Sequence, residues 1–337
     1  MWQWIAIYAA LGAAGTWLAR VYALHSRLID EPGERRSHSV ATPRGGGIAI
    51  VAAVLIATAA LGIRFPSHAP LALAFGIGLL AIAGIGWVDD HRPLSPWLRL
   101  GVHAFAAALL AFAVWYVLGN VWLALAAFAL AVGLTNVWNF MDGINGMAAS
   151  QAALVALALV WLGGPVWSWL ALALLAACVG FLPFNFPRAR IFMGDVGSGA
   201  IGYAVAALCV LAASGLGLRS GLLLLPLTAF MVDSGLTLLR RVRRGERWWT
   251  PHTQHAYQVW ARRIGHTRVT LAYAVFTLLS VVCVRYVTEV RTGFILCMGG
   301  AWYMSGAFFW WLIQKTGRET GDPISLDEPS GRAGRTD

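Results

Sequence analysis

Residues 136–147 read Asn-Val-Trp-Asn-Phe-Met-Asp-Gly-Ile-Asn-Gly-Met and close an apolar run that begins near Val121. If this run continues as a helix at about 100° per residue, its polar and glycine positions share a sector of roughly 120°. Those positions are Asn136, Asn139, Asp142, Gly143 and Gly146. Unpaired polar groups are costly at the end of a membrane helix, so the stretch predicts a ligand-binding site there.

Similar apolar runs recur along the whole chain, which has 337 residues, 59% of them hydrophobic and 12% charged. Many runs reach about 18 residues, the length that crosses the core of a bilayer. We expect an all-α polytopic membrane protein with about 10 or 11 transmembrane helices. The span at 149–163 is short enough to be tilted or re-entrant instead. The expected spans are residues 2–24, 45–63, 69–88, 98–118, 121–140, 149–163, 166–184, 196–217, 220–239, 270–290 and 293–314.

The basic residues predict how the chain is oriented. Most of them lie between the spans, in segments 25–44, 89–99, 185–195, 240–269 and 315–337. Because basic loops stay in the cytoplasm, we expect a periplasmic N-terminus and a cytoplasmic C-terminus. The net charge of +10 then reflects membrane topology and not nucleic-acid binding. We expect one transmembrane domain, 1–314, with a further cytoplasmic loop at 140–148 and a polar, disordered tail at 315–337.

Five aspartates fall at or near the cytoplasmic ends of these spans: Asp89, Asp90, Asp142, Asp195 and Asp233. Adjacent carboxylates repel unless a cation or proton relieves the repulsion, so Asp89 and Asp90 suit Mg²⁺ binding or general-base chemistry. The alternative for this pair is a solvated helix end with a local ion pair. Asp233 lies inside a span, where an acid indicates function. Alternatively, it pairs with an arginine of the 240–244 cluster.

Two glycine-rich stretches lead into spans. Pro-Arg-Gly-Gly-Gly occupies residues 43–47, and Met-Gly-Asp-Val-Gly-Ser-Gly occupies residues 193–199. Glycine lets the backbone approach an anion at a helix N-terminus, where free amides and the helix dipole favour negative charge. Plainer readings are a basic turn at the lipid headgroups for the first stretch and an N-cap by Asp195 or Ser198 for the second.

The long loop 240–269 contains His252 and His255, three residues apart among arginines and tryptophans. Zinc would need a further strong ligand nearby, and the sequence offers none. Contact with a phosphate, or acid–base help near neutral pH, fits these imidazoles better. The alternative is a helix that lies on the membrane surface. The four cysteines are scattered singly, without a metal or redox motif.

Taken together and in this order, the motifs resemble the polyprenyl-phosphate N-acetylhexosamine-1-phosphate transferase superfamily. Its bacterial members include the undecaprenyl-phosphate GlcNAc-1-phosphate transferases of O-antigen or common-antigen synthesis and the phospho-MurNAc-pentapeptide translocase of peptidoglycan. The resemblance runs from about residue 28 to residue 270. It covers the Pro-Arg-Gly-Gly-Gly entry, the paired aspartates, the Asn-x-x-Asn-x-x-Asp-Gly-x-x-Gly pattern and the Met-Gly-Asp-x-Gly-Ser motif.

The resemblance implies transfer of a sugar-1-phosphate from a UDP-N-acetylated sugar to undecaprenyl phosphate at the bacterial inner membrane, with release of UMP. It implies a metal site of Asp195 and Asn139 for Mg²⁺, with Mn²⁺ as an option, and catalytic roles for Asp89, Asp90 and Asp142. The sequence leaves open whether the protein forms a homodimer, and whether the lipid phosphate attacks directly or a covalent aspartyl intermediate forms first. Two other functions also stay open, an ion-coupled transporter and a catalytically silent scaffold. The implied substrate-binding residues are Arg44, Asn136, Asn139, Gly194, Gly197, Ser198, His252 and His255.

Three positions depart from the pattern of the superfamily. Pro93 stands where a third acid often follows the paired aspartates, and Asn145 stands where a second acid often follows the Asp-Gly pair. The His-x-His-His motif is reduced to His255-Ala-Tyr-Gln, with His252 upstream. The variant looks like the lipopolysaccharide branch, whose donors include UDP-linked N-acetylfucosamine, N-acetylquinovosamine and GlcNAc.

Overall fold

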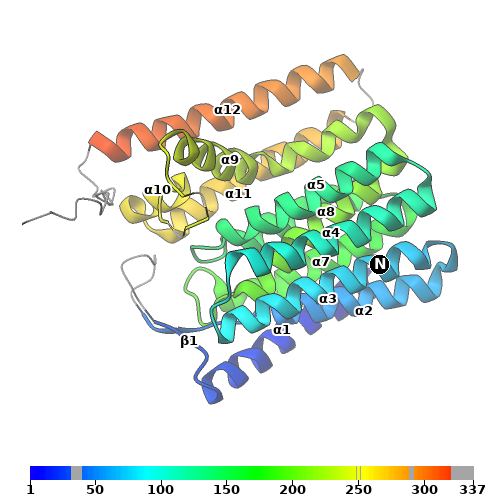
Figure 1. Ribbon diagram of the computed structural model, residues 1–337, viewed down its shortest axis with the longest axis horizontal. Helices are drawn as coiled ribbons and strands as arrows, with labels where there is room; N and C mark the ends of the chain where they lie inside the picture. The colour runs from blue at the N-terminus through cyan, green and yellow to red at the C-terminus, as the bar shows by residue number, and fades with distance from the viewer. Residues whose placement is uncertain (32–39, 248, 251, 288–291, 320–337) are drawn as a thin grey trace, which may run out of the picture.

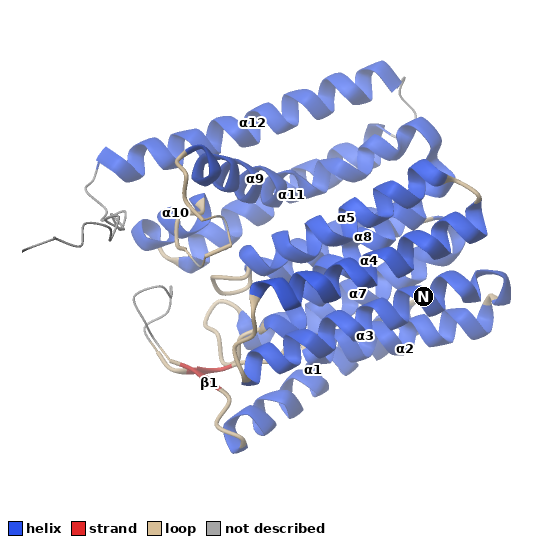
Figure 2. Ribbon diagram, in the orientation of Figure 1, coloured by secondary structure: helices blue, strands red, loops and turns tan. Residues whose placement is uncertain are grey.

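The computed structural model describes residues 1–31, 40–247, 249–250, 252–287 and 292–319, and this part of the chain is mostly helical (Figures 1 and 2). A short antiparallel pair, β1 (Ile29–Asp30) and β2 (Thr42–Pro43), lies at one end of the bundle. The helices are α1 (Trp2–His25), α2 (Ile48–Arg64), η1 (Pro66–His68), α3 (Ala69–His91), α4 (Pro96–Leu118), α5 (Val121–Phe140), α6 (Met147–Leu162), α7 (Gly164–Asn185), α8 (Asp195–Leu216), η2 (Gly217–Leu227), α9 (Thr228–Arg243), α10 (Ala256–Ile264), α11 (His266–Val287) and α12 (Thr292–Glu319).

The expectation of an all-α polytopic membrane protein is confirmed. In the described residues, eight helical segments are long and apolar enough to cross a membrane, and one of them joins α8, η2 and α9. Two more apolar helices, α2 and α6, are shorter, at 17 and 16 residues. The sixth expected span therefore forms a helix, but a short one. The predicted orientation of the two termini stays a prediction.

Two predicted boundaries change in the structure. The ninth expected span is not one helix, because η2 is a 3-10 helix and α9 begins only at Thr228. Gly217 adopts a φ of +55°, and Pro226 cannot donate a backbone hydrogen bond, which explains the break. At the C-terminus, α12 continues to Glu319, beyond the predicted start of the tail. Residues 320–337 lie outside the described part of the chain.

Helix α8 forms the centre of the bundle and packs mainly against α5 and α3. Every residue from Val196 to Ala212 is buried. In lipid, close packing of small side chains replaces the hydrophobic effect as the force between helices. Gly202 shows this packing, because a methyl group there would overlap the carbonyl group of Leu134 on α5. The start of α8 is consequently held in place by its neighbours.

Gly86 on α3 gives a direct test of this packing. A methyl group added at Gly86 would lie 2.7 Å from the backbone nitrogen of Val196, so α3 and α8 would have to separate. We expect Gly86→Ala to lower the unfolding free energy by about 2 kcal/mol. The melting temperature in detergent measures this change. Gly84→Ala on the same helix is the control, because nothing lies within 4 Å of the added methyl. Equal melting temperatures for the two variants would contradict the close contact.

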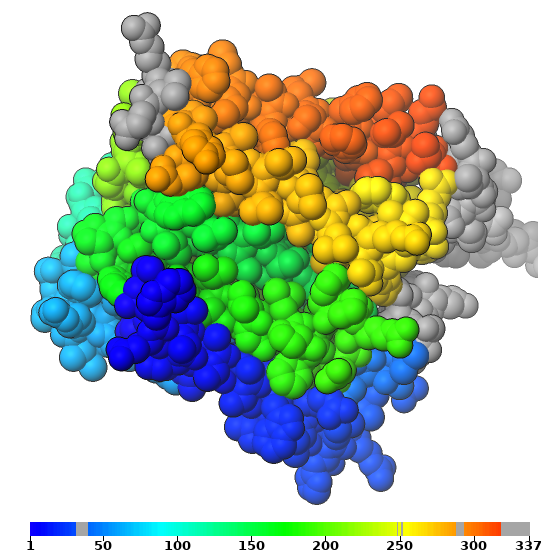
Figure 3. Space-filling view, turned by 180° about the vertical axis from the view of Figure 1, so that it is seen from behind, coloured from blue at the N-terminus to red at the C-terminus, as the bar shows by residue number. Residues whose placement is uncertain are grey.

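The helices α9–α12 lie together on one side of the bundle, with α12 at its outer edge (Figure 1). An apolar cavity of about 1070 Å³ lies between α12 and the helices α9, α10 and α11, and Asp233, Phe276 and Phe309 are among the residues that line it. Figure 3 shows a hollow here, between the orange and red α12 and the yellow α10. This cavity is distinct from the polar one described below, which lies at the end of α3 and α5 and the start of α8.

Candidate active site

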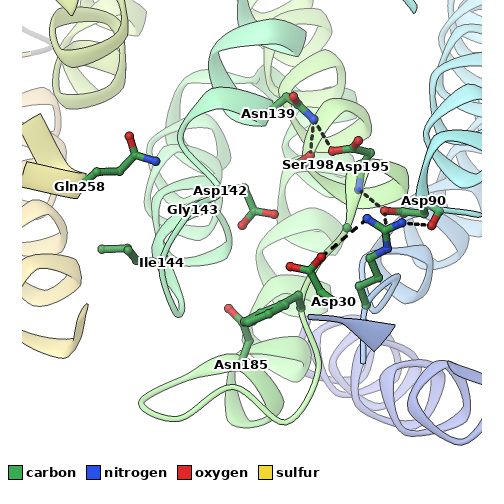
Figure 4. Close-up of a pocket in the computed structure, with 13 residues that line it drawn as sticks. Asp30, Asp90, Asn139, Asp142, Gly143, Ile144, Asn185, Asp195, Ser198 and Gln258 are labelled. Carbon is green, nitrogen blue, oxygen red and sulfur yellow. Dashed lines mark hydrogen bonds and ion pairs between the residues drawn. The ribbon is translucent and has the colours of Figure 1, made fainter. Parts of the chain in front are cut away.

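A polar cavity of about 200 Å³ lies where α3 and α5 end and α8 begins. Figure 4 shows that its walls come from segments far apart in the sequence, including the loop after α5 and the residue Gln258 of α10. Many of the predicted site residues meet here. Those that line the cavity are Arg44, Asp90, Asn139, Asp142, Gly194, Asp195 and Ser198.

Asp90 of α3 holds the first turn of α8. Its carboxylate accepts the backbone N–H groups of Asp195 at 3.0 Å and Val196 at 3.1 Å, and its side chain is 1% exposed. The predicted N-cap by Asp195 or Ser198 is wrong, because Gly194 is the cap residue and Asp90 supplies the acceptor from another helix. A carboxylate at a helix N-terminus is favoured by the unpaired amides and the helix dipole. Asp90 thereby places Asp195.

The two glycine-rich stretches lie against this junction. Gly194 adopts a φ of +76°, and a Cβ atom there would lie 2.6 Å from a carboxylate oxygen of Asp90, so only glycine fits. Arg44 donates to the backbone carbonyl of Asp90, and its Nε lies 3.7 Å from the Asp90 carboxylate. The β1–β2 pair also brings Asp30 to 4.0 Å from Arg44. One guanidinium therefore lies at the edge of an otherwise acidic cavity.

Asp195 has a different environment from Asp90. Its Oδ1 accepts a hydrogen bond from Asn139 Nδ2 at 2.7 Å, and the same nitrogen also donates to Ser198 at 3.1 Å. Its Oδ2 lies 3.5 Å from Nη1 of Arg99, which donates to Asp89 at 2.7 Å. Asp89 also accepts the backbone N–H of Leu94. Arg99 thus links Asp89 to Asp195. Asp89 itself does not line the cavity.

The loop between α5 and α6 delivers Asp142. Helix α5 ends at Phe140, as the expected span 121–140 does, so the helical sector considered for residues 136–147 does not extend to Asp142. Gly146 adopts a φ of +74°, and its N–H donates to Asn185 at 2.7 Å, which fixes the loop. In the described part of the chain, no donor or cation contacts the Asp142 carboxylate, which points into the cavity (Figure 4). Burial, followed by the charges of Asp195 and Asp90, raises the pKa of Asp142 well above its usual range.

The histidines lie beside the cavity, and neither lines it. His255 is buried at the start of α10, and its ring centre is 4.8 Å from that of His252. Burial lowers the pKa of His252 to about 3, helped by the nearby His255 and Arg241. His252 is therefore neutral near pH 7 and brings no positive charge to a phosphate. The predicted phosphate contact by the two histidines stays a prediction. From α10, Gln258 reaches the cavity instead.

Two further predicted residues have packing roles. Asn136 donates to the Val132 carbonyl at 2.8 Å and lines a side cavity of about 80 Å³ together with Arg99 and His103. Gly197 lies against Gly47, so that α2 and α8 approach closely at the rim of the site. Substrate binding by Asn136 and Gly197 also stays a prediction.

The donor set of the polar cavity fits a hard divalent cation such as Mg²⁺. Among the described residues, no cluster of three or more His, Cys, Asp or Glu could hold a metal by protein ligands alone. Mg²⁺ does not require such a cluster, because it commonly keeps several waters and uses one or two carboxylates with substrate phosphates. Asp142 and Asp195 line the same cavity, and a cation between them would relieve their repulsion. The carboxamide oxygen of Asn139 is a third suitable donor.

Several residues of the site were missed by sequence reasoning. In the sequence, Arg99 is one more basic residue near a span, and nothing marks it as a partner of the paired aspartates except its position shortly after them. Asn185 is the last residue of α7, two positions after Pro183, and it also donates to the Ile191 carbonyl at 2.9 Å. Asp30 and Gln258 belong to β1 and α10, within the segments 25–44 and 240–269 that the sequence predicts as loops, and no periodicity reveals their folded positions. Of these residues, only Arg99 lies close enough in the sequence to its partners to suggest the contact.

The chain is similar in sequence to several known proteins. Residues 72–213 match the family described as Glycosyl transferase family 4. Decaprenyl-phosphate N-acetylglucosaminephosphotransferase of Mycobacterium tuberculosis is 32% identical over 311 residues, covering 78% of this chain and 76% of the relative. Phospho-N-acetylmuramoyl-pentapeptide-transferase of Heliobacterium modesticaldum is 31% identical over 274 residues, covering 72% and 82%. A probable undecaprenyl-phosphate N-acetylglucosaminyl 1-phosphate transferase of Bacillus subtilis is 32% identical over 199 residues, covering 54% and 55%. The chain therefore belongs to glycosyl transferase family 4, among relatives that are polyprenyl-phosphate N-acetylhexosamine-1-phosphate transferases.

Proposed function

We propose that the protein transfers an N-acetylated sugar-1-phosphate from a UDP-sugar to undecaprenyl phosphate, and that this step initiates O-antigen or a related surface polysaccharide. The cavity would face the cytoplasm from the bacterial inner membrane. The observation that carries the proposal is the meeting of Asp142, Asp195 and Arg44 in one cavity at the end of an apolar helix bundle. Such a site can bind a diphosphate while the helices accommodate a polyprenyl chain.

In the proposed reaction, an oxygen of the lipid phosphate forms a bond to the sugar-side phosphorus of the donor, and the bond from that phosphorus to UMP breaks. This chemistry needs positioning and charge neutralisation more than covalent help from the protein. Mg²⁺ bound by Asp195 and Asn139 would neutralise the donor diphosphate. Arg44 at the cavity edge would hold a phosphate oxygen.

The contacts suggest a division of labour among the aspartates. Both Asp89 and Asp90 are fully engaged, the first with Arg99 and the second with the start of α8. We therefore assign them positioning roles. Asp142 is the carboxylate without a hydrogen-bond partner among the described residues, and we assign it to contact the substrates or the cation directly. Nδ1 of a neutral His252 accepts the Gln254 N–H, so its Nε2–H would donate a hydrogen bond to the UDP-sugar without attracting its charge.

An ion-coupled transporter would place its acids near the middle of the membrane, in paired broken helices. In this structure, Asp90, Asp142 and Asp195 gather at one end of the bundle. Asp233, the deepest of the predicted acids, accepts hydrogen bonds from two backbone amides of α10. This arrangement gives the transporter alternative no support.

The test is release of UMP by the purified full-length protein. With Mg²⁺ and undecaprenyl phosphate, we expect UMP from at least one of UDP-GlcNAc, UDP-N-acetylfucosamine and UDP-N-acetylquinovosamine. Chelation by EDTA should reduce the rate by about a hundredfold or more, and added Mg²⁺ or Mn²⁺ should restore it. Omission of the lipid is the control. Absence of UMP with every donor would contradict the proposal, and the donor panel also identifies the sugar.

A further inference from the structure

A second buried carboxylate holds a helix N-terminus away from the polar cavity. Asp233 of α9 is 2% exposed. It accepts the backbone N–H of Ala256 at 2.8 Å and that of Tyr257 at 3.0 Å, which are the first two residues of α10. These amides have no partner within their own helix, and the charge also interacts favourably with the helix dipole. Asp233 therefore holds the start of α10, together with the capping box that His255 and Gln258 form there.

The other neighbours of Asp233 keep its carboxylate within the protein. The hydroxyl of Tyr273 on α11 donates to it at 2.7 Å, and the hydroxyl of Thr237 lies at 3.3 Å. Nδ1 of His255 is 3.6 Å away. The predicted alternative, a pair with an arginine of the 240–244 cluster, is not what the structure shows, because Arg241 binds Glu246. Asp233 does not line the polar cavity and so does not touch the proposed substrates there.

Helix α10 connects Asp233 to the wall of the polar cavity. The hydroxyl of Tyr257 donates to the Phe140 carbonyl at 2.9 Å, at the last residue of α5. A methyl group at Gly143 would overlap this hydroxyl, so Tyr257 packs directly against the loop that carries Asp142. Burial, and then the charges of Asp233 and Asp142, raise the pKa of Tyr257 well above its usual range, which keeps its hydroxyl protonated as a donor. Gln258 follows and lines the cavity beside Gly143.

We propose that Asp233 is a positioning residue for the transfer reaction, which holds α10 so that Tyr257 and Gln258 form the cavity wall beside Asp142. This inference rests on the proposed function, because it assigns the cavity to the UDP-sugar. Loosening α10 would disturb the wall of the donor site. Arg44, which we assign to a phosphate oxygen, contacts Asp30 and Asp90 and would keep its position. Asp233 therefore acts on donor binding through α10 and makes no contact with the reacting atoms.

Asp233→Asn tests the role, because the amide keeps the shape but turns one acceptor into an N–H group that faces backbone amides. We expect the KM for the UDP-sugar to rise about tenfold or more, as for the loss of a buried charge-assisted hydrogen bond. The KM for undecaprenyl phosphate should rise less than the KM for the UDP-sugar. Trypsin should cleave faster at Arg262, which is exposed on α10. A general loss of folded protein would lower the maximal rate without this difference between the two KM values.

Tyr273→Phe is the matched control, because it removes one donor to Asp233 and leaves both backbone contacts in place. The KM of this variant for the UDP-sugar should stay within about threefold of the wild-type value. A wild-type donor KM together with wild-type trypsin resistance in Asp233→Asn would overturn the positioning role. If no UDP-sugar supports UMP release by the wild type, the proposed function fails, and the trypsin comparison still decides whether Asp233 holds α10.

Discussion

Asp195→Asn is expected to reduce UMP release by about a thousandfold or more, because the carboxylate assigned to the cation becomes neutral. The change is nearly isosteric, and the amide oxygen can still accept the hydrogen bond from Asn139 that now reaches Oδ1 at 2.7 Å. Asp90 contacts the backbone N–H of residue 195, which the substitution leaves in place. The variant should therefore fold and bind detergent as the wild type does, while its initial rate with the best donor falls.

Two measurements separate lost chemistry from lost structure in this variant. The melting temperature should not fall, because the substitution removes one of several carboxylates that repel one another in the cavity. The Mg²⁺ concentration that gives half of the residual activity should rise. A rate within about tenfold of wild type would contradict the assignment of Asp195 to the cation, since a lost cation ligand costs more than that.

The spans could be predicted because membrane helices leave a long apolar signal, and the site motifs could be found because carboxylates and glycines are unusual at span ends. The partners of those carboxylates could not be predicted. Asp89 and Asp90 are adjacent, yet successive residues of a helix point about 100° apart. Consequently Asp89 meets Arg99 on α4 and Asp90 meets the start of α8. Which direction each side chain takes is decided by packing between helices.

The end of α5 shows a second limit of the sequence. The apolar run predicts the end of the span at residue 140, but it does not reveal the partners that hold the loop after it. Asn185, far along the chain, accepts the N–H of Gly146, and Tyr257 from α10 binds the carbonyl of Phe140. These long-range hydrogen bonds stabilise a loop that local propensity leaves undecided. Asp142 reaches the cavity from that loop and not from a helical face.

Asp90 and Asp233 make the same kind of interaction at two places in the fold. Each is a buried carboxylate on one helix that accepts the first backbone amides of another helix, α8 for Asp90 and α10 for Asp233. The first contact places Asp195 in the cavity, and the second places the wall beside Asp142. A carboxylate used in this way affects stability as well as catalysis. It should therefore respond to mutation differently from Asp195.

Asp90→Asn is expected to lower both stability and activity. The wild-type carboxylate gives one oxygen to each of two amides, from Asp195 and Val196. Asparagine has only one oxygen, and its NH₂ group would face the second amide, so a buried donor loses its partner. We expect a loss of about 1–3 kcal/mol in unfolding free energy, because such a donor keeps its full desolvation cost. The melting temperature in detergent measures it.

Activity of Asp90→Asn should fall by about a hundredfold or more even below its melting temperature, because the first turn of α8 no longer holds Asp195 in line with the donor phosphate. Asp195→Asn is the matched comparison, since it removes a charge from the same cavity without removing the acceptor of the α8 amides. The two variants should therefore differ in melting temperature while both lose activity. A wild-type melting temperature for Asp90→Asn would show that Asp90 does not hold α8, and its effect on rate would then belong to the chemistry alone.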